Sequence, residues 1–482
     1  MPSPLRDVVP PHVVAPPVLA VDDYYAIPQV QERIREYCGG ARAVRPTAAY
    51  VVTLGTDAAA RPTWDVGTRI PANELDTVWT RRADIARALW DVRHLLFVLE
   101  IDYENTDAQG EPFLHPADVF VKLEPAYLAT LEVCERLGLQ VAVIMTGRGY
   151  HFIGQIALDD PSVDALVDLA PGQPAWFESV PARRPAGVTA DLSARHAQAA
   201  TGLGYLVEYV AHLIHRAAIT STIPVVFNGV TVGNAGPVGR ECASIDFSYV
   251  GDPLDVRHVR TAFSTYQGHR LRPDIFGSAA ATVAPFVALP RNRHCLTSML
   301  IHGRGFEAGR HAAIGTRAQL PDLSSGMSTA LTMYRSSRLA QFHREYDAAL
   351  RRTTARPVEL HTLPPCVATS LEYPNDLLLK PEHIQHLVRD LMSRGWNPAD
   401  IARLLQSRYE SPQQWGDRWT TRMHAQTRAE FEVRVFAGLI VTGVDSLIDF
   451  NCVSAQEKGL CPRSACRYDL RIDRNRLWGL TE

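Results

Sequence analysis

The 482-residue sequence lacks any apolar stretch approaching the roughly 20 residues that a membrane-spanning helix requires. It also lacks a strong charge of either sign, because 49 Lys and Arg residues against 52 Asp and Glu residues give a formal net charge of −3. The N-terminus, MPSPLRDVVPPHVVAPPVLA, has neither the basic start nor the compact apolar core of a secretory signal. We therefore expect a protein with no membrane segment and a cytoplasmic location, whose residues 1–28 form an extended Pro-rich arm.

Lysine is scarce, so arginine carries nearly all of the basic charge. Arg suits bidentate phosphate contacts better than Lys does, although a GC-rich genome produces the same usage. The balanced charge excludes a uniformly basic surface for nucleic acid, whereas a local basic groove is compatible with it. The length predicts two or three domains.

No C-x-x-C spacing occurs among the eight cysteines, and without an export signal a disulfide framework is not expected. Four are scattered singly, and we expect each to pack as a small buried hydrophobe: Cys38, Cys134, Cys242 and Cys295. The other four fall in the last quarter of the chain: Cys366, Cys452, Cys461 and Cys466. Four thiolates suit either zinc or an iron–sulfur cluster, and four unrelated buried thiols are the alternative.

The periodicity divides the chain into a mixed α and β body over residues 29–325 and an almost wholly helical module over 357–482. In the body we expect strands at 95–103, 139–146, 150–156, 224–232 and 243–250, and helices at 124–138 and 193–217. A single long polar helix is expected at 328–352, within a linker over 326–356. In the module we expect helices at 381–394, 397–409 and 424–441, followed by the loop NCVSAQEKGLCPRSAC.

Three acidic residues alternate along the first of these strands. LLFVLEIDYE (95–104) places Glu100, Asp102 and Glu104 two residues apart, so their side chains share one face. Carboxylates held side by side repel one another unless cations lie between them, and Mg²⁺ or Mn²⁺ prefers such oxygen ligands. The alternative is an edge strand with a solvated acidic face. The upstream apolar run needs burial on both faces, which favours acids that emerge from a core.

A glycine-rich turn follows in TGRGYHF (146–152). Gly147 and Gly149 allow the backbone to approach a ligand closely, while Arg148 and His151 supply donors suited to phosphate oxygens. A plain hairpin connection between two strands is the alternative.

A later aspartate precedes a basic stretch. In ASIDFSYVGDP (243–253), Asp246 interrupts an apolar strand, where a carboxylate without a metal or Arg partner would be costly. The following segment VRHVRTAFSTYQGHR (256–270) predicts either a phosphate or template grip or a solvated basic face. Its basic residues are Arg257, His258, Arg260, His269 and Arg270.

Taken in order, these elements resemble the archaeo-eukaryotic primase superfamily over about residues 90–275. The resemblance implies a primase-polymerase catalytic domain with an RRM-like sheet core, using Mg²⁺ or Mn²⁺. It implies that Asp102 pairs with Glu100 or Glu104 and that Asp246 is the third metal ligand. Tyr266 stands where the family has a histidine in its basic stretch. The nucleotide-binding residues implied by the resemblance are Arg148, Gly149, His151, Arg257, Arg260, Ser264 and His269.

The C-terminal module is similar to the C-terminal domain of the primase large subunit, which holds a 4Fe-4S cluster. The similarity rests on LPPC (363–366), the helices that follow it and NCVSAQEKGLCPRSAC. It implies that Cys366, Cys452, Cys461 and Cys466 are cluster ligands, and the compact spacing of the last three leaves Zn²⁺ as the alternative. On this interpretation the chain joins the catalytic and accessory halves of a primase.

The two resemblances together imply a DNA primase-polymerase. It would join NTPs or dNTPs on single-stranded DNA by two-metal nucleotidyl transfer, with de novo initiation and with a replicative helicase as a candidate partner. Three alternatives stay open at this point: a repair or gap-filling polymerase without initiation, a catalytically degenerate DNA-binding accessory protein, and a nuclease.

Overall fold

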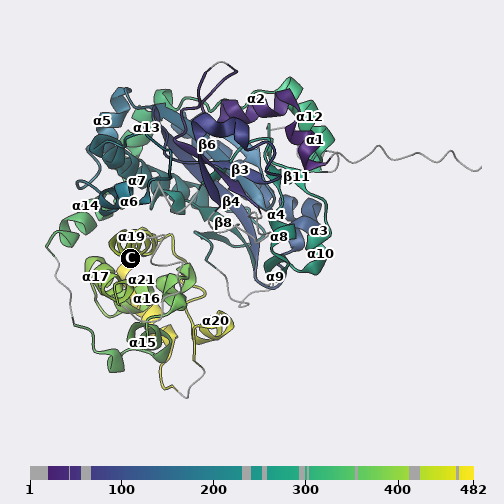
Figure 1. Ribbon diagram of the computed structural model, residues 1–482. Helices are drawn as coiled ribbons and strands as arrows, with labels where there is room; N and C mark the ends of the chain where they lie inside the picture. Colours follow the sequence, from purple (N-terminus) through teal and green to yellow (C-terminus); the bar gives the residue numbers. More distant parts are fainter. Residues whose placement is uncertain are drawn as a thin grey trace, which may run out of the picture.

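The structure is a computed structural model, shown in Figure 1, in which an upper lobe contains the β-sheets and a lower lobe is helical. The chain is therefore an α+β protein, as expected from the sequence. The structure describes residues 20–42, 44–55, 67–230, 240–251, 258–292, 299–300, 303–352, 357–411, 424–462 and 466–481.

The central sheet of the upper lobe has six strands in the order β12-β5-β6-β4-β8-β7. Its members are β4 (His94–Asn105), β5 (Ala142–Met145), β6 (Gly149–Ala157), β7 (Val225–Phe227), β8 (Glu241–Asp246) and β12 (Leu289–Pro290). Neighbouring strands run antiparallel, except that β7 and β8 are parallel. β4 has a partner on each side, which confirms the central strand predicted from the apolar run.

One face of this sheet packs on two long helices, α4 (Pro116–Leu137) and α7 (Ala194–Ala217). The odd-numbered β4 residues, including Leu99 and Ile101, belong to this core. α4 begins eight residues before the expected start and ends at Gly138, whose φ of 72° suits a glycine. α7 begins after Ser193, whose side chain accepts a hydrogen bond from the backbone N–H of His196.

Two smaller sheets and two N-terminal helices cover part of the opposite face, where the β4 residues Leu96 and Val98 are buried. The strands are β1 (Tyr50–Leu54), β2 (Thr68–Pro71), β3 (Asp84–Arg87) and β9 (Val259–Arg260) in one sheet, and β10 (Thr265–Tyr266) and β11 (Phe286–Val287) in the other. The helices are α1 (Val21–Tyr25) and α2 (Pro28–Tyr37). The expectation of an extended arm is therefore wrong for residues 20–28, because Tyr24 and Tyr25 are fully buried. Residues 1–19 of the arm lie outside the described residues.

The segment that the sequence predicted as one long helix is two helices, α13 (Ser324–Arg335) and α14 (Arg338–Leu350). The break occurs because Ser337 has an extended backbone and its side chain caps the second helix by accepting from the N–H of Ala340. α13 packs on the upper lobe, and Gly326 lies against the backbone of Gly138. Figure 1 shows α14 at the edge of the upper lobe, leading toward the lower one.

The lower lobe contains the three helices expected from the sequence, close to the expected limits. Its helices are α15 (Pro365–Glu372), α16 (Pro381–Ser393), α17 (Pro398–Tyr409), α19 (Ala425–Val441), α20 (Cys452–Glu457) and α21 (Leu470–Thr481). α20 lies in the segment expected to be a loop, because the side chain of Asn451 caps a short helix. None of the described helices is long and apolar enough to cross a membrane.

The remaining helices are short and lie in the upper lobe. They are α3 (Glu111–Leu114), α5 (Pro161–Val167), α6 (Val180–Arg183), α8 (Gly268–Leu271), α9 (Pro273–Phe276), α10 (Ser278–Ala281) and α12 (Phe306–Gly315).

The two lobes share one continuous apolar core, which includes residues of β4, α7, α16 and α19. A buried ion pair also joins them, because the Arg434 Nε of α19 lies 3.0 Å from a carboxylate oxygen of Glu208 in α7. Glu208 also lies 3.2 Å from the Nε2 atom of His343. These contacts fix the lower lobe against the upper one.

Candidate active site on the acidic face of the central sheet

The strand register brings the predicted acidic residues together. Glu100 of β4 is directly opposite His151 of β6 on one side and Asp246 of β8 on the other. Residues directly opposite one another in antiparallel strands share a face, with Cβ atoms about 4.5–5.5 Å apart. Asp102 lies on the same face one step along β4, opposite Gly149 and Ser244. Four of the predicted site residues therefore form one compact group.

The position of this group follows from the residues that precede it on the same face. Leu96 and Val98 belong to the second hydrophobic core, and Glu100 follows two residues later. The acidic face thus begins where the apolar packing of β4 ends. Glu100 and Asp246 are 5% and 6% exposed, which makes their negative charge costly without nearby cations.

A histidine and an arginine side chain approach the carboxylates directly. The His151 Nε2 atom lies 2.5 Å from a Glu100 carboxylate oxygen. Arg148 bridges two others, with Nη2 2.8 Å from the Asp102 Oδ2 atom and Nη1 3.1 Å from the Glu104 Oε1 atom. Arg148 of the GRG turn therefore supplies a positive charge to the acidic strand.

Burial and repulsion between the carboxylates change the pKa values of this group. Burial raises the pKa of Asp102 to about 6, and the charges of Glu100 and Glu104 add to the effect although Arg148 opposes it. Burial acts to lower the pKa of Arg148, but Glu104 and Asp102 hold that pKa well above its usual range. The charges of this group are therefore strongly coupled to one another.

Asp246 ends β8 instead of interrupting a longer strand, which corrects the expectation of a strand over 243–250. Its Oδ1 atom accepts a hydrogen bond from the backbone N–H of Ser248 at 2.8 Å, and this contact turns the chain into a short 3-10 helix over Ser248–Val250. The carboxylate consequently lies at the end of a strand, beside Glu100.

The two glycines of the GRG turn are required by protein contacts. A Cβ atom on Gly149 would lie 1.8 Å from the carbonyl oxygen of Ile101, and one on Gly147 would lie 2.6 Å from the ring of Tyr266. The close approach that the sequence pattern assigned to a ligand is therefore made by β4 and by an aromatic ring. The turn is also a hairpin connection between β5 and β6, which was the alternative to a ligand-binding turn.

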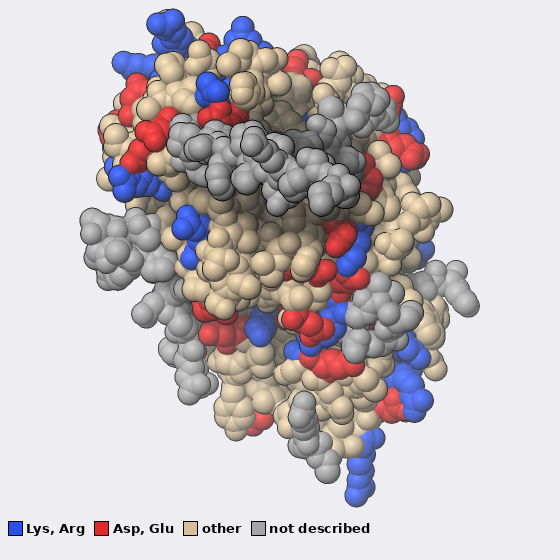
Figure 2. Space-filling model, turned by 90° about the vertical axis from the view of Figure 1, so that its right-hand side faces the viewer, with Lys and Arg blue, Asp and Glu red and all other residues tan. Residues whose placement is uncertain are grey.

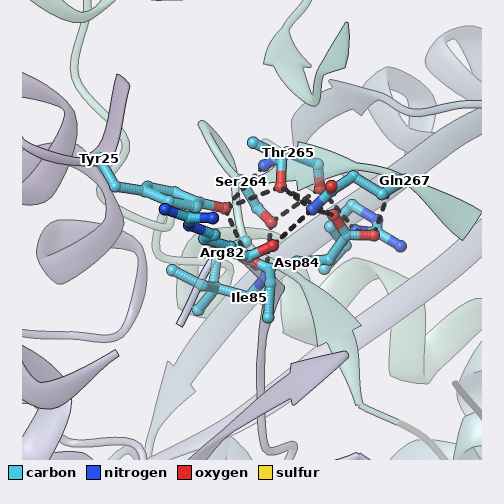
Figure 3. A network of polar contacts seen from close by, with 10 residues as sticks. Tyr25, Arg82, Asp84, Ile85, Ser264, Thr265 and Gln267 are labelled. Atoms are coloured by element: carbon cyan, nitrogen blue, oxygen red, sulfur yellow. Dashed lines mark hydrogen bonds and ion pairs between the residues drawn. The ribbon is translucent and has the colours of Figure 1, made fainter. Parts of the chain in front are cut away.

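Part of the predicted basic stretch forms a wall beside this turn. Arg260 lies with its guanidinium 4.4 Å from the ring centroid of Tyr266, and its Nη1 atom is 2.8 Å from the Asp84 Oδ2 atom. Asp84 is fully buried and also accepts from the hydroxyl of Thr265 and the backbone N–H of Gln267. Figure 3 shows Asp84 of β3, Thr265 and Gln267 of the segment around β10, and Tyr25 of α1 converging. Arg260 and Thr265 of the basic stretch are thus held by contacts with Asp84 inside the protein.

Two other predicted nucleotide-binding residues, Ser264 and His269, contact groups other than the acidic residues. The Ser264 hydroxyl donates to the carbonyl of Thr265 and accepts from the N–H of Ile85, and the residue is fully buried. His269 is also fully buried and stacks on aromatic rings, including that of Phe113 at 4.7 Å between centroids. Arg257 lies outside the described residues.

Arg304 is a site residue that the sequence pattern did not reveal. Its Nη2 atom donates to the carbonyl oxygens of Thr146 and Gly147, at 2.7 and 3.2 Å, and its guanidinium lies over the ring of Phe286. Burial lowers the pKa of Arg304 to about 10. The signal was present in the sequence as a second Gly-Arg-Gly, at residues 303–305.

The chemistry of the acidic group fits hard divalent cations, since it consists of oxygen donors on adjacent strands with a raised Asp102 pKa. Within the described ranges, however, no three His, Cys, Asp or Glu side chains are arranged as ligands of a single metal ion. In the acidic group, Asp102 contacts Arg148 and Glu100 contacts His151. Cation binding would require these side chains to change partners.

The late cysteines lie in the lower lobe, with different exposures. Cys366 is buried, Cys452 and Cys461 are partly buried, and Cys466 is exposed. Burial raises the pKa of the Cys366 thiol, and nearby Asp390, Cys461 and Cys452 add to the shift. The Nε2 atom of His386 lies 3.2 Å from the Cys366 sulfur, a contact that the sequence did not suggest. Of the scattered cysteines, Cys38, Cys134 and Cys242 are buried as expected, and Cys295 is not described.

The surface in Figure 2 shows Lys and Arg side chains interspersed with Asp and Glu, with a broad uncharged area between them. Among the coloured atoms of this face no continuous basic stripe is visible. Beside the acidic group, the positive charge of Arg148 acts on Asp102 and Glu104.

No protein-family model, curated protein or solved structure matches this chain.

Proposed function

We propose that this chain is a template-directed nucleotidyltransferase of the primase-polymerase kind, which joins NTPs or dNTPs on single-stranded DNA. One observation carries the proposal: the register that sets Glu100 opposite both Asp246 and His151, with Asp102 on the same face. Two carboxylate-bearing strands, a histidine and a turn arginine are the groups that a triphosphate with divalent cations requires.

The proposed roles follow from the positions of the side chains. Glu100, Asp102 and Asp246 would hold Mg²⁺ or Mn²⁺, which supplies activation of the attacking hydroxyl and neutralisation of the leaving phosphates. Glu100 is favoured over Glu104 as the partner of Asp102 because Glu104 is opposite Cys242, farther along β8 from Asp246. Arg148 is partly exposed beside the carboxylates and would bind phosphate oxygens, as would His151.

The lower lobe is proposed to hold a 4Fe-4S cluster, with zinc as the alternative, through Cys366, Cys452, Cys461 and Cys466. Support comes from the sequence, in which Cys452, Cys461 and Cys466 follow one another closely, and from the burial of the Cys366 thiol. Metal analysis and visible absorption of anaerobically purified protein decide between the two metals. Iron with a visible band that bleaches on reduction supports the cluster, and stoichiometric zinc in colourless protein excludes it.

The proposed activity is tested by incubating the purified protein with single-stranded DNA, Mn²⁺ and labelled NTPs or dNTPs, without a primer. We expect labelled products from the wild type and none from Asp102→Asn or Asp246→Asn, both still folded. Glu100→Gln and Glu104→Gln form a matched pair on one strand face. We expect the first to abolish incorporation and the second to retain most of it.

Each other outcome identifies an alternative. Extension of a primed template without primer-free products indicates a gap-filling or repair polymerase. Shortening of the DNA indicates a nuclease, because carboxylate-bound cations also hydrolyse phosphodiesters. Full incorporation by either aspartate variant would remove the proposed site, and an inactive wild type that still binds DNA indicates an accessory protein.

A further inference from the structure

Arg148 differs from the neighbouring arginines in what it binds. Arg260 is held by the buried Asp84 and by the backbone carbonyl of Thr265, and Arg304 by two backbone carbonyls. The guanidinium of Arg148 instead bridges two carboxylates, Asp102 and Glu104. It therefore neutralises an aspartate that the proposed function assigns to divalent cations.

The bridge is open enough to be broken without unfolding. The Arg148 side chain is 28% exposed, that of Asp102 is 13% exposed and that of Glu104 is 30% exposed. The long side chain stands on a tight turn whose backbone is fixed by Gly147 and Gly149. We therefore expect that, when Arg148 changes its partner, its side chain moves and the backbone of the turn stays in place.

Two cations that bind one carboxylate oppose each other, whereas a cation and a phosphate support each other. From this geometry we propose that Arg148 is an exchangeable counter-ion. It neutralises Asp102 and Glu104 while the site is empty, releases Asp102 when the carboxylates take up divalent cations, and then binds a phosphate of the incoming nucleotide. The inference rests on the proposed function and adds an order of events: nucleotide binding and cation binding are coupled through this one side chain.

The proposed exchange predicts that replacing Arg148 strengthens Mn²⁺ binding in the absence of a phosphate ligand. The same replacement should weaken the effect of a phosphate ligand on that binding. Without nucleotide, Arg148→Gln should bind Mn²⁺ about tenfold more tightly than the wild type, because a competing positive charge is gone. Arg148→Lys should lie between the two, because an ammonium keeps the charge but cannot bridge two carboxylates in the same way. Tripolyphosphate should tighten Mn²⁺ binding in the wild type and much less in Arg148→Gln.

The experiment measures free Mn²⁺ by electron paramagnetic resonance during titration of wild type, Arg148→Gln and Arg148→Lys, with and without tripolyphosphate. Arg310→Gln is the control, since Arg310 pairs with the Glu307 carboxylate on α12 and both side chains are more exposed than that of Arg148. We expect it to match the wild type. Circular dichroism establishes whether each variant is folded. If Arg148→Gln is unfolded, the comparison is made between the wild type and Arg148→Lys.

Equal or weaker Mn²⁺ binding by both Arg148 variants, relative to wild type, would overturn the exchange. This result is separable from the proposed function. If the wild type incorporates nucleotides but the order of Mn²⁺ affinities is absent, the exchange fails alone. If the order is present but nothing is incorporated, the proposed polymerase fails and the counter-ion role stands.

Discussion

Gly149 is the residue on which the geometry of the acidic group depends most directly. It is opposite Asp102 in the β4–β6 ladder, and its missing side chain lets the two backbones come together beside Ile101. In β6 it also precedes His151 by two residues, so both lie on the same face. A side chain here would separate the histidine from its carboxylate partner as well as the strands from one another.

We predict that Gly149→Ala destabilises the protein by more than about 3 kcal/mol, because the added methyl group would lie 1.8 Å from a carbonyl oxygen. Gly305→Ala is the control, since a Cβ atom added there would meet no other atom within 4 Å and the φ of Gly305 is −79°. Urea unfolding should show the control within about 0.5 kcal/mol of the wild type. A Gly149→Ala protein as stable as the control would contradict the close approach.

At the scale of elements, one aromatic ring, that of Tyr266, packs against the GRG turn. Tyr266 of β10 lies against Gly147, and the nearest atoms are ring carbons. Arg260 covers the ring from one side and is fixed by Asp84 of β3. The position of the β5–β6 turn thus depends on a strand from the neighbouring sheet.

We predict that Tyr266→Phe keeps nucleotide incorporation close to the wild-type rate, because the ring and not the hydroxyl contacts the turn. Tyr266→Ala should lose about tenfold or more in nucleotide affinity, since a turn with no wall holds Arg148 less precisely. Steady-state incorporation at varied nucleotide concentration separates the two variants. Equal losses in both would assign the effect to the hydroxyl and contradict the packing argument.

The elements that carry the acidic group were predictable because their signals are local. An apolar run ending in alternating acids gave β4, and helical periodicity gave α7. Two element boundaries were missed, the end of β8 and the break between α13 and α14, because a single side chain determines each of them. Asp246 ends β8 by binding its own downstream backbone, and Ser337 divides a continuous helical pattern by capping.

The side-chain partners within the site were less predictable than the strands that carry them. Sequence spacing placed the three acids on one face but left open which glutamate belongs with Asp102, because that depends on register with β8. The partners of the basic stretch depend on Asp84 and on contacts with the N-terminal helices, which are distant in the sequence. For the same reason the spacing could not show that Ser264 is committed to the backbone of β3.

At the scale of the whole molecule, the lobes are joined by a buried charge pair. Glu208 of α7 contacts both Arg434 of α19 and His343 of α14. Its pKa is about 2, because His343 and Arg434 together outweigh the cost of burial, which acts to raise it. The carboxylate is therefore ionised at neutral pH and needs its partners.

We predict that Arg434→Met costs about 3–5 kcal/mol, because it leaves the Glu208 carboxylate buried without its arginine partner. Arg403→Met, which removes a more exposed arginine of the same lobe, should cost about 1 kcal/mol or less. A double-mutant cycle with Glu208→Gln should recover much of the loss. Additive effects in that cycle would mean that the pair does not couple the lobes.

The packing of α19 has a consequence for the end of β8. The ring of Phe431 lies 6.3 Å from that of Phe247, the residue next to Asp246, and also touches the backbone at Gly251. A small rotation of α19 would press on both ends of the segment that aims the Asp246 carboxylate. A displacement of α19 would therefore reach the end of β8, where Asp246 stands, through the contact between these two rings.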